Sequence, residues 1–184
     1  IGQSGSGKTV LLKSLLGIHT PESGQICFDG RVYSELDKNE KRDLRTEIGM
    51  VFQGSALFDS MTVAENVGFP LRMFTNDNNA KIKERVDFVL ERVALIDAHT
   101  KLPSQISGGM QKRVAIARAI VNRPKYLFCD EPNSGLDPNT SILIDNLIKE
   151  ITEEYDITTV INTHDMNSVM VIGDNILFLK VGLK

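Results

Sequence analysis

Short apolar runs recur along this chain, and longer amphipathic stretches lie between them. Continuous apolar runs over residues 48–52 and 126–129 are typical of strands buried on both faces, and the β-branched run over 158–163 also predicts a strand. The apolar run over 176–179 predicts the last strand. Because strands alternate with helical stretches, the pattern predicts an α/β fold with a mainly parallel sheet flanked by helices.

Helical periodicity fills the intervals between these strands. Thr62 and Glu65 form a capping box ahead of a helix that runs to Met73, and apolar residues recur at helical spacing over 82–93. Asp165 is predicted to cap a short helix near the end. The same reasoning predicts helices over 9–16, 35–47, 110–121 and 139–155, and short strands over 25–28 and 31–33 around an Asp-Gly turn.

These elements suggest one α/β domain with a helical insertion. Residues 60–121 are predicted to form the helical subdomain, and residues 1–59 and 122–184 the two parts of the core. A length of 184 residues with 41% hydrophobic residues is enough for one buried core.

Charge and cysteine content exclude several classes of protein. The net charge of −3 argues against broad nucleic-acid binding, and no run of about 18 apolar residues predicts a membrane span. Nor is there a signal peptide. Cys27 and Cys129 lie in apolar runs without metal-ligand spacing, so we expect two buried thiols in a reducing compartment.

Residues 2–9 fit the phosphate-binding loop G-x-x-x-x-G-K-[ST]. Its glycines let successive amides point at an anion, and the following helix start adds its positive dipole end. Lys8 is expected to reach the β- and γ-phosphates and Thr9 to hold Mg²⁺. The predicted nucleotide-binding residues are Gly2, Gln3, Ser4, Gly5, Ser6, Gly7, Lys8, Thr9 and Val10. The alternative is a Gly/Ser-rich linker that contains Lys-Thr.

Both ends of the chain look abrupt. A strand normally leads into a phosphate-binding loop, but only Ile1 precedes it here, and the last residues, 181–184, look equally abrupt. We therefore expect the sequence to be truncated at both ends.

Asp130 and Glu131 directly follow the apolar run over 126–129. At the carboxyl end of a strand, Asp130 would hold Mg²⁺ through water and Glu131 would polarise the attacking water. The alternative is that these two acids simply begin an ordinary loop before Pro132. The presence of a phosphate-binding loop in the same chain favours the catalytic interpretation.

Residues 106–119 resemble the signature motif of ATP-binding-cassette (ABC) ATPases. The resemblance covers nearly the whole chain and implies a phosphate-loop NTPase fold with a helical subdomain. Ile106 and Met110 stand where the family usually has Leu and Gln, but the serine and glycines between them are kept. The other family elements appear in the family's order: the phosphate loop, Gln53, Asp130-Glu131-Pro132, Ser134-Gly135-Leu136-Asp137 and His164-Asp165.

The resemblance implies roles for individual residues. Gln53 matches the loop glutamine that touches Mg²⁺ and senses the γ-phosphate, although a glutamine after a strand is also an ordinary surface residue. His164 matches the switch histidine that contacts the γ-phosphate and holds Glu131 and water; its alternative is a solvated loop histidine. Catalysis would then rest on Glu131, His164 and Gln53, and the metal on Thr9, Gln53 and Asp130.

The signature residues are implied to act on a second molecule. In the family, the segment that Ser107, Gly108, Gly109 and Met110 match caps the ATP bound to a partner subunit, so two chains hold two ATPs head to tail. A serine and glycine amides at a helix start do form an anion site. Asp137 matches the loop that joins the two sites, although the 134–138 segment is also a plain turn before a helix. ATP and Mg²⁺ are the implied cofactors.

The family also implies membrane partners. Its transporters dock a permease against the segment after the glutamine, where Leu57, Phe58 and Met61 are apolar candidates that could equally pack into the helical insertion. Such a subunit is cytoplasmic and peripheral to the inner face of the membrane. The 51–58 segment together with Ser-Gly-Gly-Met is similar to ATPases of bacterial phospholipid-trafficking transporters. Non-transport ABC ATPases of DNA repair or ribosome function and unrelated phosphate-loop kinases or GTPases are the alternatives.

Overall fold

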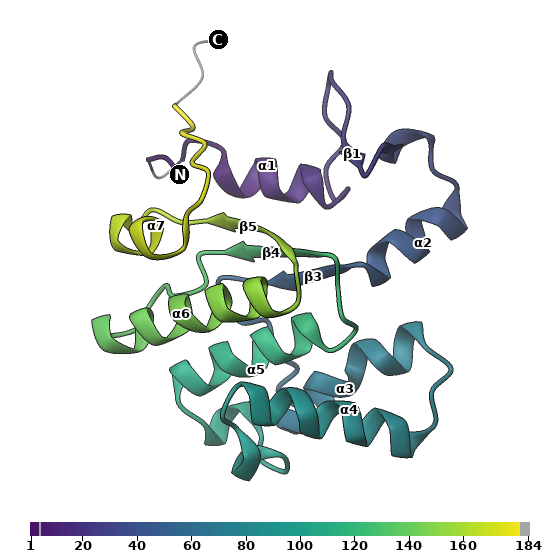
Figure 1. The fold of residues 1–184 in the computed structure, drawn as a ribbon, viewed down its shortest axis with the longest axis vertical. Helices are drawn as coiled ribbons and strands as arrows, with labels where there is room; N and C mark the ends of the chain where they lie inside the picture. Colours follow the sequence, from purple (N-terminus) through teal and green to yellow (C-terminus); the bar gives the residue numbers. More distant parts are fainter. Residues whose placement is uncertain (4, 181–184) are drawn as a thin grey trace.

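The computed structural model describes residues 1–3 and 5–180, and Figure 1 shows their arrangement. Ser4 and residues 181–184 lie outside the described residues. The elements in order are α1 (Lys8–Leu15), β1 (Cys27–Phe28), β2 (Arg31–Val32), η1 (Tyr33–Glu35), α2 (Lys38–Thr46), β3 (Ile48–Val51), α3 (Val63–Phe74), α4 (Asn79–Arg92), η2 (Ile96–Ala98), η3 (Pro103–Gln105), α5 (Gly108–Ile120), β4 (Tyr126–Asp130), α6 (Pro138–Glu154), β5 (Thr158–Asn162) and α7 (Met166–Ile172).

The central sheet has three parallel strands in the order β3-β4-β5. Ile48 pairs with Tyr126 and Tyr126 with Thr158, so the three strands start level and their carboxyl ends meet at one edge. A separate hairpin pairs β1 with β2 across Asp29 and Gly30, both of which have positive φ, as a tight hairpin turn requires. The α/β fold with a parallel sheet is confirmed.

Strand β4 separates two apolar clusters. Successive side chains of a strand point to opposite faces. Leu127 and Cys129 therefore join the larger cluster with α3, α4, α5 and α6, whereas Tyr126 and Phe128 join a smaller one with Leu12 of α1. Figure 1 shows α1 on one side of the strands and α5 and α6 on the other. Burial on both faces explains why β4 has no alternating polar positions.

The helices of the predicted insertion pack mainly on one another and on the larger cluster. Thr62 and Glu65 make the predicted capping box at the start of α3, with the Glu65 carboxylate accepting from the Thr62 amide at 2.8 Å. At Gly68, an added Cβ would lie 3.2 Å from Val86 Cγ2, so α3 and α4 approach closely there. Whether residues 60–121 form a separate subdomain stays a prediction.

Three expectations about local structure are wrong. Residues 176–179 form no strand: their pairing is one parallel bridge between Gly2 and Leu179, and Ile176, Leu177 and Phe178 are exposed. Among the described residues, the backbone of this segment bonds Ile1 instead of a strand of the sheet: the Leu179 amide donates to the Ile1 oxygen at 2.7 Å.

The expected helix over 35–47 is interrupted, because Leu36 and Asp37 are extended and the Asp37 side chain caps α2 by accepting from Asn39 and Glu40 amides. Cys27 is exposed on the hairpin, whereas Cys129 is buried as expected.

Within the described residues, no helix combines the length and the apolar character needed to cross a bilayer.

Candidate functional site

Two glycines of the loop before α1 have left-handed backbones. Gly5 and Gly7 have φ values of 79° and 92°, in the left-handed region that favours glycine. Gly7 is the N-cap of α1, and no side chain caps this helix. The first amides of α1 are therefore free of side-chain partners and available to a phosphate. Of the predicted loop residues, Ser4 lies outside the described part of the chain.

The Lys8 ammonium lies over the same loop. Its Nζ donates to the backbone oxygens of Gly2 at 2.8 Å and Gln3 at 3.1 Å. These bonds fold the side chain back along the loop instead of extending it to solvent. A charged donor held above open amides adds to the attraction for an anion.

The structure brings Thr9 and Asp130 together from opposite parts of the sequence. Thr9 Oγ1 donates to Asp130 Oδ1 at 3.3 Å. Asn162, at the end of β5, donates its Nδ2 to Asp130 Oδ1 at 2.5 Å and to Thr9 Oγ1 at 3.5 Å. Sequence reasoning missed Asn162. It ends a β-branched strand two residues before His164, and it pairs in register with Asp130, so the strand order would have revealed it.

The donors at this point suit Mg²⁺. Among residues 1–3 and 5–180, no group of three His, Cys, Asp or Glu side chains is placed to hold a metal ion. A hydroxyl and a carboxylate are hard oxygen donors, which Mg²⁺ prefers, and it commonly takes only one or two carboxylates and completes its shell with water and substrate phosphates. Thr9 and Asp130 next to a phosphate-binding loop fit this chemistry.

Glu131 and His164 form the second part of the site. His164 Nδ1 lies 2.9 Å from Glu131 Oε1 and 2.8 Å from Oε2. Because an ionised carboxylate only accepts, Nδ1 carries the proton of this bond and Nε2 faces elsewhere. The Glu131 side chain is 11% exposed and that of His164 is 68% exposed. A nearly buried carboxylate is thus steered by an imidazole that remains open to solvent.

The backbone of Glu131 is strained. Its φ is 49°, in the left-handed region that side chains other than glycine, asparagine and aspartate rarely adopt. Its amide donates to the Asn162 oxygen at 2.8 Å, which continues the β4–β5 ladder by one residue. Strained residues of this kind cluster at functional sites, where the surrounding structure holds them in place.

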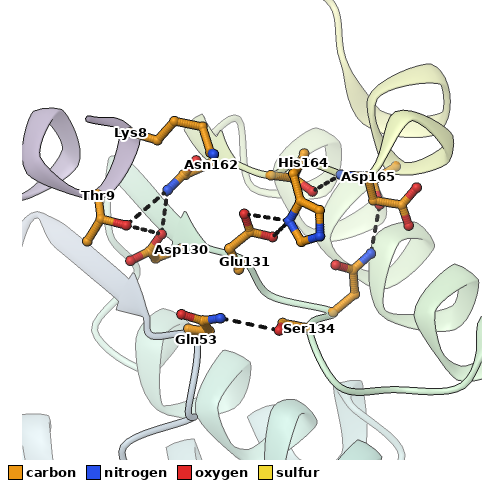
Figure 2. A network of polar contacts seen from close by, with 12 residues as sticks. Lys8, Thr9, Gln53, Asp130, Glu131, Ser134, Asn162, His164 and Asp165 are labelled. Atoms are coloured by element: carbon orange, nitrogen blue, oxygen red, sulfur yellow. Dashed lines mark hydrogen bonds and ion pairs between the residues drawn. The ribbon is translucent and has the colours of Figure 1, made fainter. Parts of the chain in front are cut away.

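Gln53 follows β3 and lies beside Ser134, below Asp130 and Glu131 in the view of Figure 2. Its Nε2 donates to Ser134 Oγ at 3.3 Å, and its backbone oxygen accepts from Lys112 Nζ. The structure places Gln53 against the loop that follows Glu131, but no hydrogen bond joins it to Thr9 or Asp130 among the described residues. Its role at the metal stays a prediction.

The signature residues begin α5. Ser107 is exposed and is the N-cap, with its Oγ accepting from the Met110 amide at 3.2 Å. Gly108 is also exposed, whereas the Met110 side chain packs on the larger cluster, and its amide is already bonded to Ser107. At Gly109, an added Cβ would lie 2.7 Å from Thr140 Cγ2, which makes glycine necessary for the packing of α5 on α6.

Asp137 is the N-cap of α6. Its carboxylate accepts from the Thr140 amide at 3.1 Å, and hydrogen bonds from Thr140 hold the pKa of Asp137 below its usual value. Asp137 is exposed, so a second molecule can reach it. The predicted interface role stays a prediction.

A buried polar cluster that sequence reasoning missed lies behind the acids. Asn133 Nδ2 lies 2.7 Å from Ser168 Oγ of α7 and 3.3 Å from Asp145 Oδ2 of α6. All three residues are buried, and burial raises the pKa of Asp145. The cluster ties the loop after Glu131 to α6 and α7. No local sequence pattern joins residues this far apart.

An aromatic cavity of about 250 Å³ lies between β3, the segment after Gln53 and α3. Phe58 is exposed at its edge, 4.8 Å between ring centroids from Phe69, whereas Leu57 packs on the larger cluster and Met61 is partly buried. The half-buried Arg118 guanidinium donates to the backbone oxygen of Ser55 at 2.7 Å and fixes this segment. The candidates thus divide: Phe58 faces outward and Leu57 inward.

Comparison with known proteins identifies relatives of the whole chain. Methionine import ATP-binding protein MetN 1 of Pseudomonas syringae pv. syringae is 42% identical over 183 residues, which make up 100% of this chain and 55% of that protein. Probable ribonucleotide transport ATP-binding protein mkl of Mycobacterium bovis is 42% identical over 178 residues, 95% of this chain and 49% of that protein. The chain spans about half the length of the curated relatives it matches.

Solved structures and a family model agree with these relatives. The dimeric structure of MJ0796, a bacterial ABC transporter cassette, matches with a TM-score of 0.88 at 35% identity over 98% of this chain and 79% of that one. The structure of cbiO1 from Clostridium perfringens, part of the ABC transporter complex cbiONQ, matches with a TM-score of 0.89 at 36% identity over 99% of this chain and 72% of that one. The family model described as ABC transporter matches residues 1–134. The chain therefore belongs to the ABC transporter family, and its fold is that of an ABC ATPase.

Proposed function

We propose that this chain is the ATP-hydrolysing subunit of an ABC transporter. One observation carries the proposal: a phosphate-binding loop, the Thr9–Asp130 contact and the Glu131–His164 pair meet at the carboxyl edge of one parallel sheet. This edge is where ligands of open α/β sheets bind. The names of the relatives favour a transport ATPase over the alternative of a DNA-repair or ribosome-associated one.

The residues of this chain divide the work of hydrolysis. Lys8 and the open amides of α1 bind the β- and γ-phosphates. Thr9 and Asp130 would hold Mg²⁺, which neutralises phosphate charge when it is bound. The Glu131 carboxylate accepts a proton from the attacking water. His164, whose Nδ1 bonds that carboxylate, would hold it in place and contact the γ-phosphate. Gln53 would complete the site when its loop moves toward the nucleotide.

The proposal includes a head-to-tail dimer. Ser107 and Gly108 are exposed at the start of α5, where a partner's ATP can meet the serine hydroxyl and the glycine amides. Two copies would then enclose two ATPs, with Asp137 at the interface. The likeness to a structure of MJ0796 solved as a dimer supports this arrangement.

We further propose that integral membrane permease subunits dock at the aromatic cavity beside Phe58. An exposed aromatic side chain at the rim of an apolar cavity is typical of a protein docking site. The likeness to cbiO1, described as part of a transporter complex, supports a membrane partner. The chain would then lie on the cytoplasmic face of the membrane, held there through the permease, and no nucleic acid takes part.

For the transported cargo, phospholipid is weighed against methionine. Resemblance of the 51–58 segment favours phospholipids, but the relatives described above are named for methionine import and ribonucleotide transport, so they give phospholipid no support. We keep phospholipid as the substrate to be tested against methionine, by asking which of the two stimulates ATP hydrolysis of the complex with its permease.

Replacing the acid tests the proposed activity. In Glu131→Gln, the γ-phosphate site is unchanged but the proton acceptor is lost, so kcat for ATP hydrolysis should fall about 10²- to 10⁴-fold. ATP affinity should stay within about twofold of wild type, and the ATP-bound dimer should accumulate. A control, Glu153→Gln on the exposed face of α6, should hydrolyse ATP at the wild-type rate. Unchanged turnover in Glu131→Gln would refute the assigned base.

A further inference from the structure

Lys112 is a buried cation that the proposed hydrolysis does not use. It lies on α5, five residues after Ser107, and is only 5% exposed. Its Nζ donates to the backbone oxygen of Gln53. Among the ion pairs of residues 1–3 and 5–180, none includes Lys112.

A buried ammonium without a counter-ion is unfavourable. Charged groups lose hydration when they are buried, and a methionine of similar length would fill the same space without that cost. Burial lowers the pKa of Lys112, whereas the charge of Glu131 raises it. A buried charge kept at this cost needs a specific partner, which here is the backbone oxygen of Gln53.

The bond from Lys112 is the first link in a continuous series of contacts that ends at Glu131. Gln53, whose backbone accepts from Lys112, donates its side-chain Nε2 to Ser134 Oγ at 3.3 Å. The Ser134 amide in turn donates to the Glu131 backbone oxygen at 3.1 Å. Three short contacts thus join α5, the loop after β3 and the loop after β4. These are the segments that carry the signature serine, the predicted metal-side glutamine and the predicted base.

We propose that Lys112 is a positioning residue that holds Gln53, and through Ser134 the Glu131 loop, in place relative to the start of α5. The inference rests on the proposed hydrolysis of ATP. A charged donor makes a stronger bond to a carbonyl oxygen than a neutral one, and in a dry setting it has no water to replace it. Displacing α5 would break this bond, and the acid loop would then lose its alignment with the bound nucleotide.

Two substitutions at position 112 separate this role from a merely structural one. Lys112→Met keeps the apolar stem and removes the donor, so kcat should fall about 10- to 100-fold, as expected for a small misplacement of a catalytic group. The dissociation constant for ATP should stay within about twofold of wild type, because the phosphate loop is untouched. Lys112→Arg restores a charged donor and should recover most of the lost turnover. Loss of binding and turnover together in Lys112→Met would overturn the proposal, and so would unchanged turnover.

Arg113→Met is the matched control. Arg113 lies on the same helix and also donates to backbone oxygens, but to those of Val93 and Ala94 instead of Gln53. The kcat of Arg113→Met per folded molecule should equal that of the wild type. An equal loss in Arg113→Met and Lys112→Met would mean that α5 acts through stability alone, which overturns the proposal.

Ser134→Ala provides a second route if Lys112→Met does not fold. It breaks the next link and should also lower kcat without weakening ATP binding; wild-type turnover in Ser134→Ala would overturn the series of contacts. In the double variant the two losses should not add, because both remove the same connection. A wild-type protein that hydrolyses no ATP would refute the proposed function. Active wild type with equally active Lys112→Met would refute only the role of Lys112.

Discussion

The helices α1 and α5 both start at serine and glycine residues, but their first turns differ. At α1, Gly7 is left-handed and no side chain caps the helix, so its first amides stay open. At α5, the Ser107 hydroxyl accepts from the Met110 amide, so one of the first amides of this helix already has a partner. Thr9, at the start of α1, is hydrogen-bonded to Asp130 of the same chain. Ser107 and Gly108, at the start of α5, are exposed.

This difference explains why two similar segments are expected to do different work. An uncapped start beside a cation and a metal-binding pair can bind a phosphate within one chain. A capped start keeps fewer free amides, although the Ser107 hydroxyl can still donate its own proton. We expect the α5 start to bind weakly alone and to contribute only when a partner brings a nucleotide to it.

The largest effect should come from the cation at α1. Lys8→Met removes charge-assisted hydrogen bonds to the phosphates, each worth about 1.5–3 kcal/mol, so ATP affinity should fall roughly 10- to 100-fold. Equilibrium titration with ATP measures this change in the monomer. Lys13→Met, in the last turn of the same helix, should bind ATP as wild type does. If Lys8→Met binds ATP with wild-type affinity, the start of α1 is not the primary phosphate-binding site.

Ser107→Arg tests whether α5 acts only across an interface. The bulky side chain replaces an exposed serine, so ATP binding to the monomer should stay within about twofold, while the ATP-dependent dimer should weaken about tenfold or more. Sedimentation with and without ATP distinguishes the two states. Ser104→Arg, at another exposed serine on η3, is the control and should dimerise normally. Unimpaired dimerisation of Ser107→Arg would exclude α5 from the interface.

Two glycine substitutions should give the smallest effects, measured as losses in the free energy of unfolding. A second substitution, at Thr140, should rescue one of them and not the other. Gly7→Ala introduces a side chain at φ 92°, where the left-handed backbone costs roughly 1–2 kcal/mol, although nothing lies within 4 Å of the new Cβ. Gly109→Ala has ordinary φ but meets Thr140, an overpacking that costs about 1–3 kcal/mol.

Thr140→Ser removes the clashing methyl group, so it should rescue Gly109→Ala and leave Gly7→Ala unchanged. Free energies of unfolding in urea measure both cycles. Equal rescue of the two alanine variants would show that the two helix starts are not distinguished by conformation and packing as described.

Much of the fold follows from local patterns in the sequence. Strands β3, β4 and β5 were predicted because continuous apolar or β-branched runs have few alternatives, and the capping box at Thr62 because its two residues lie three positions apart. The strand over 176–179 was wrong because a strand depends on a neighbour that its own sequence does not contain.

Parts of the site escaped prediction for the same reason. Asn162 and the Asn133 cluster act through residues distant in sequence, so they become visible only when strand order and helix packing are known. Lys112 reads as a solvated lysine on an amphipathic helix, and only its burial against the Gln53 loop sets it apart.

At Glu131, the side chain needed for activity requires a left-handed backbone that lowers the stability of the fold. Holding a glutamate at φ 49° costs roughly 1–2 kcal/mol. The pair with the exposed His164 returns about 0–1 kcal/mol. An asparagine or glycine at this position would relax the backbone and abolish the proton acceptor. A screen that selects this protein for heat resistance alone will therefore enrich folded but inactive variants at residue 131.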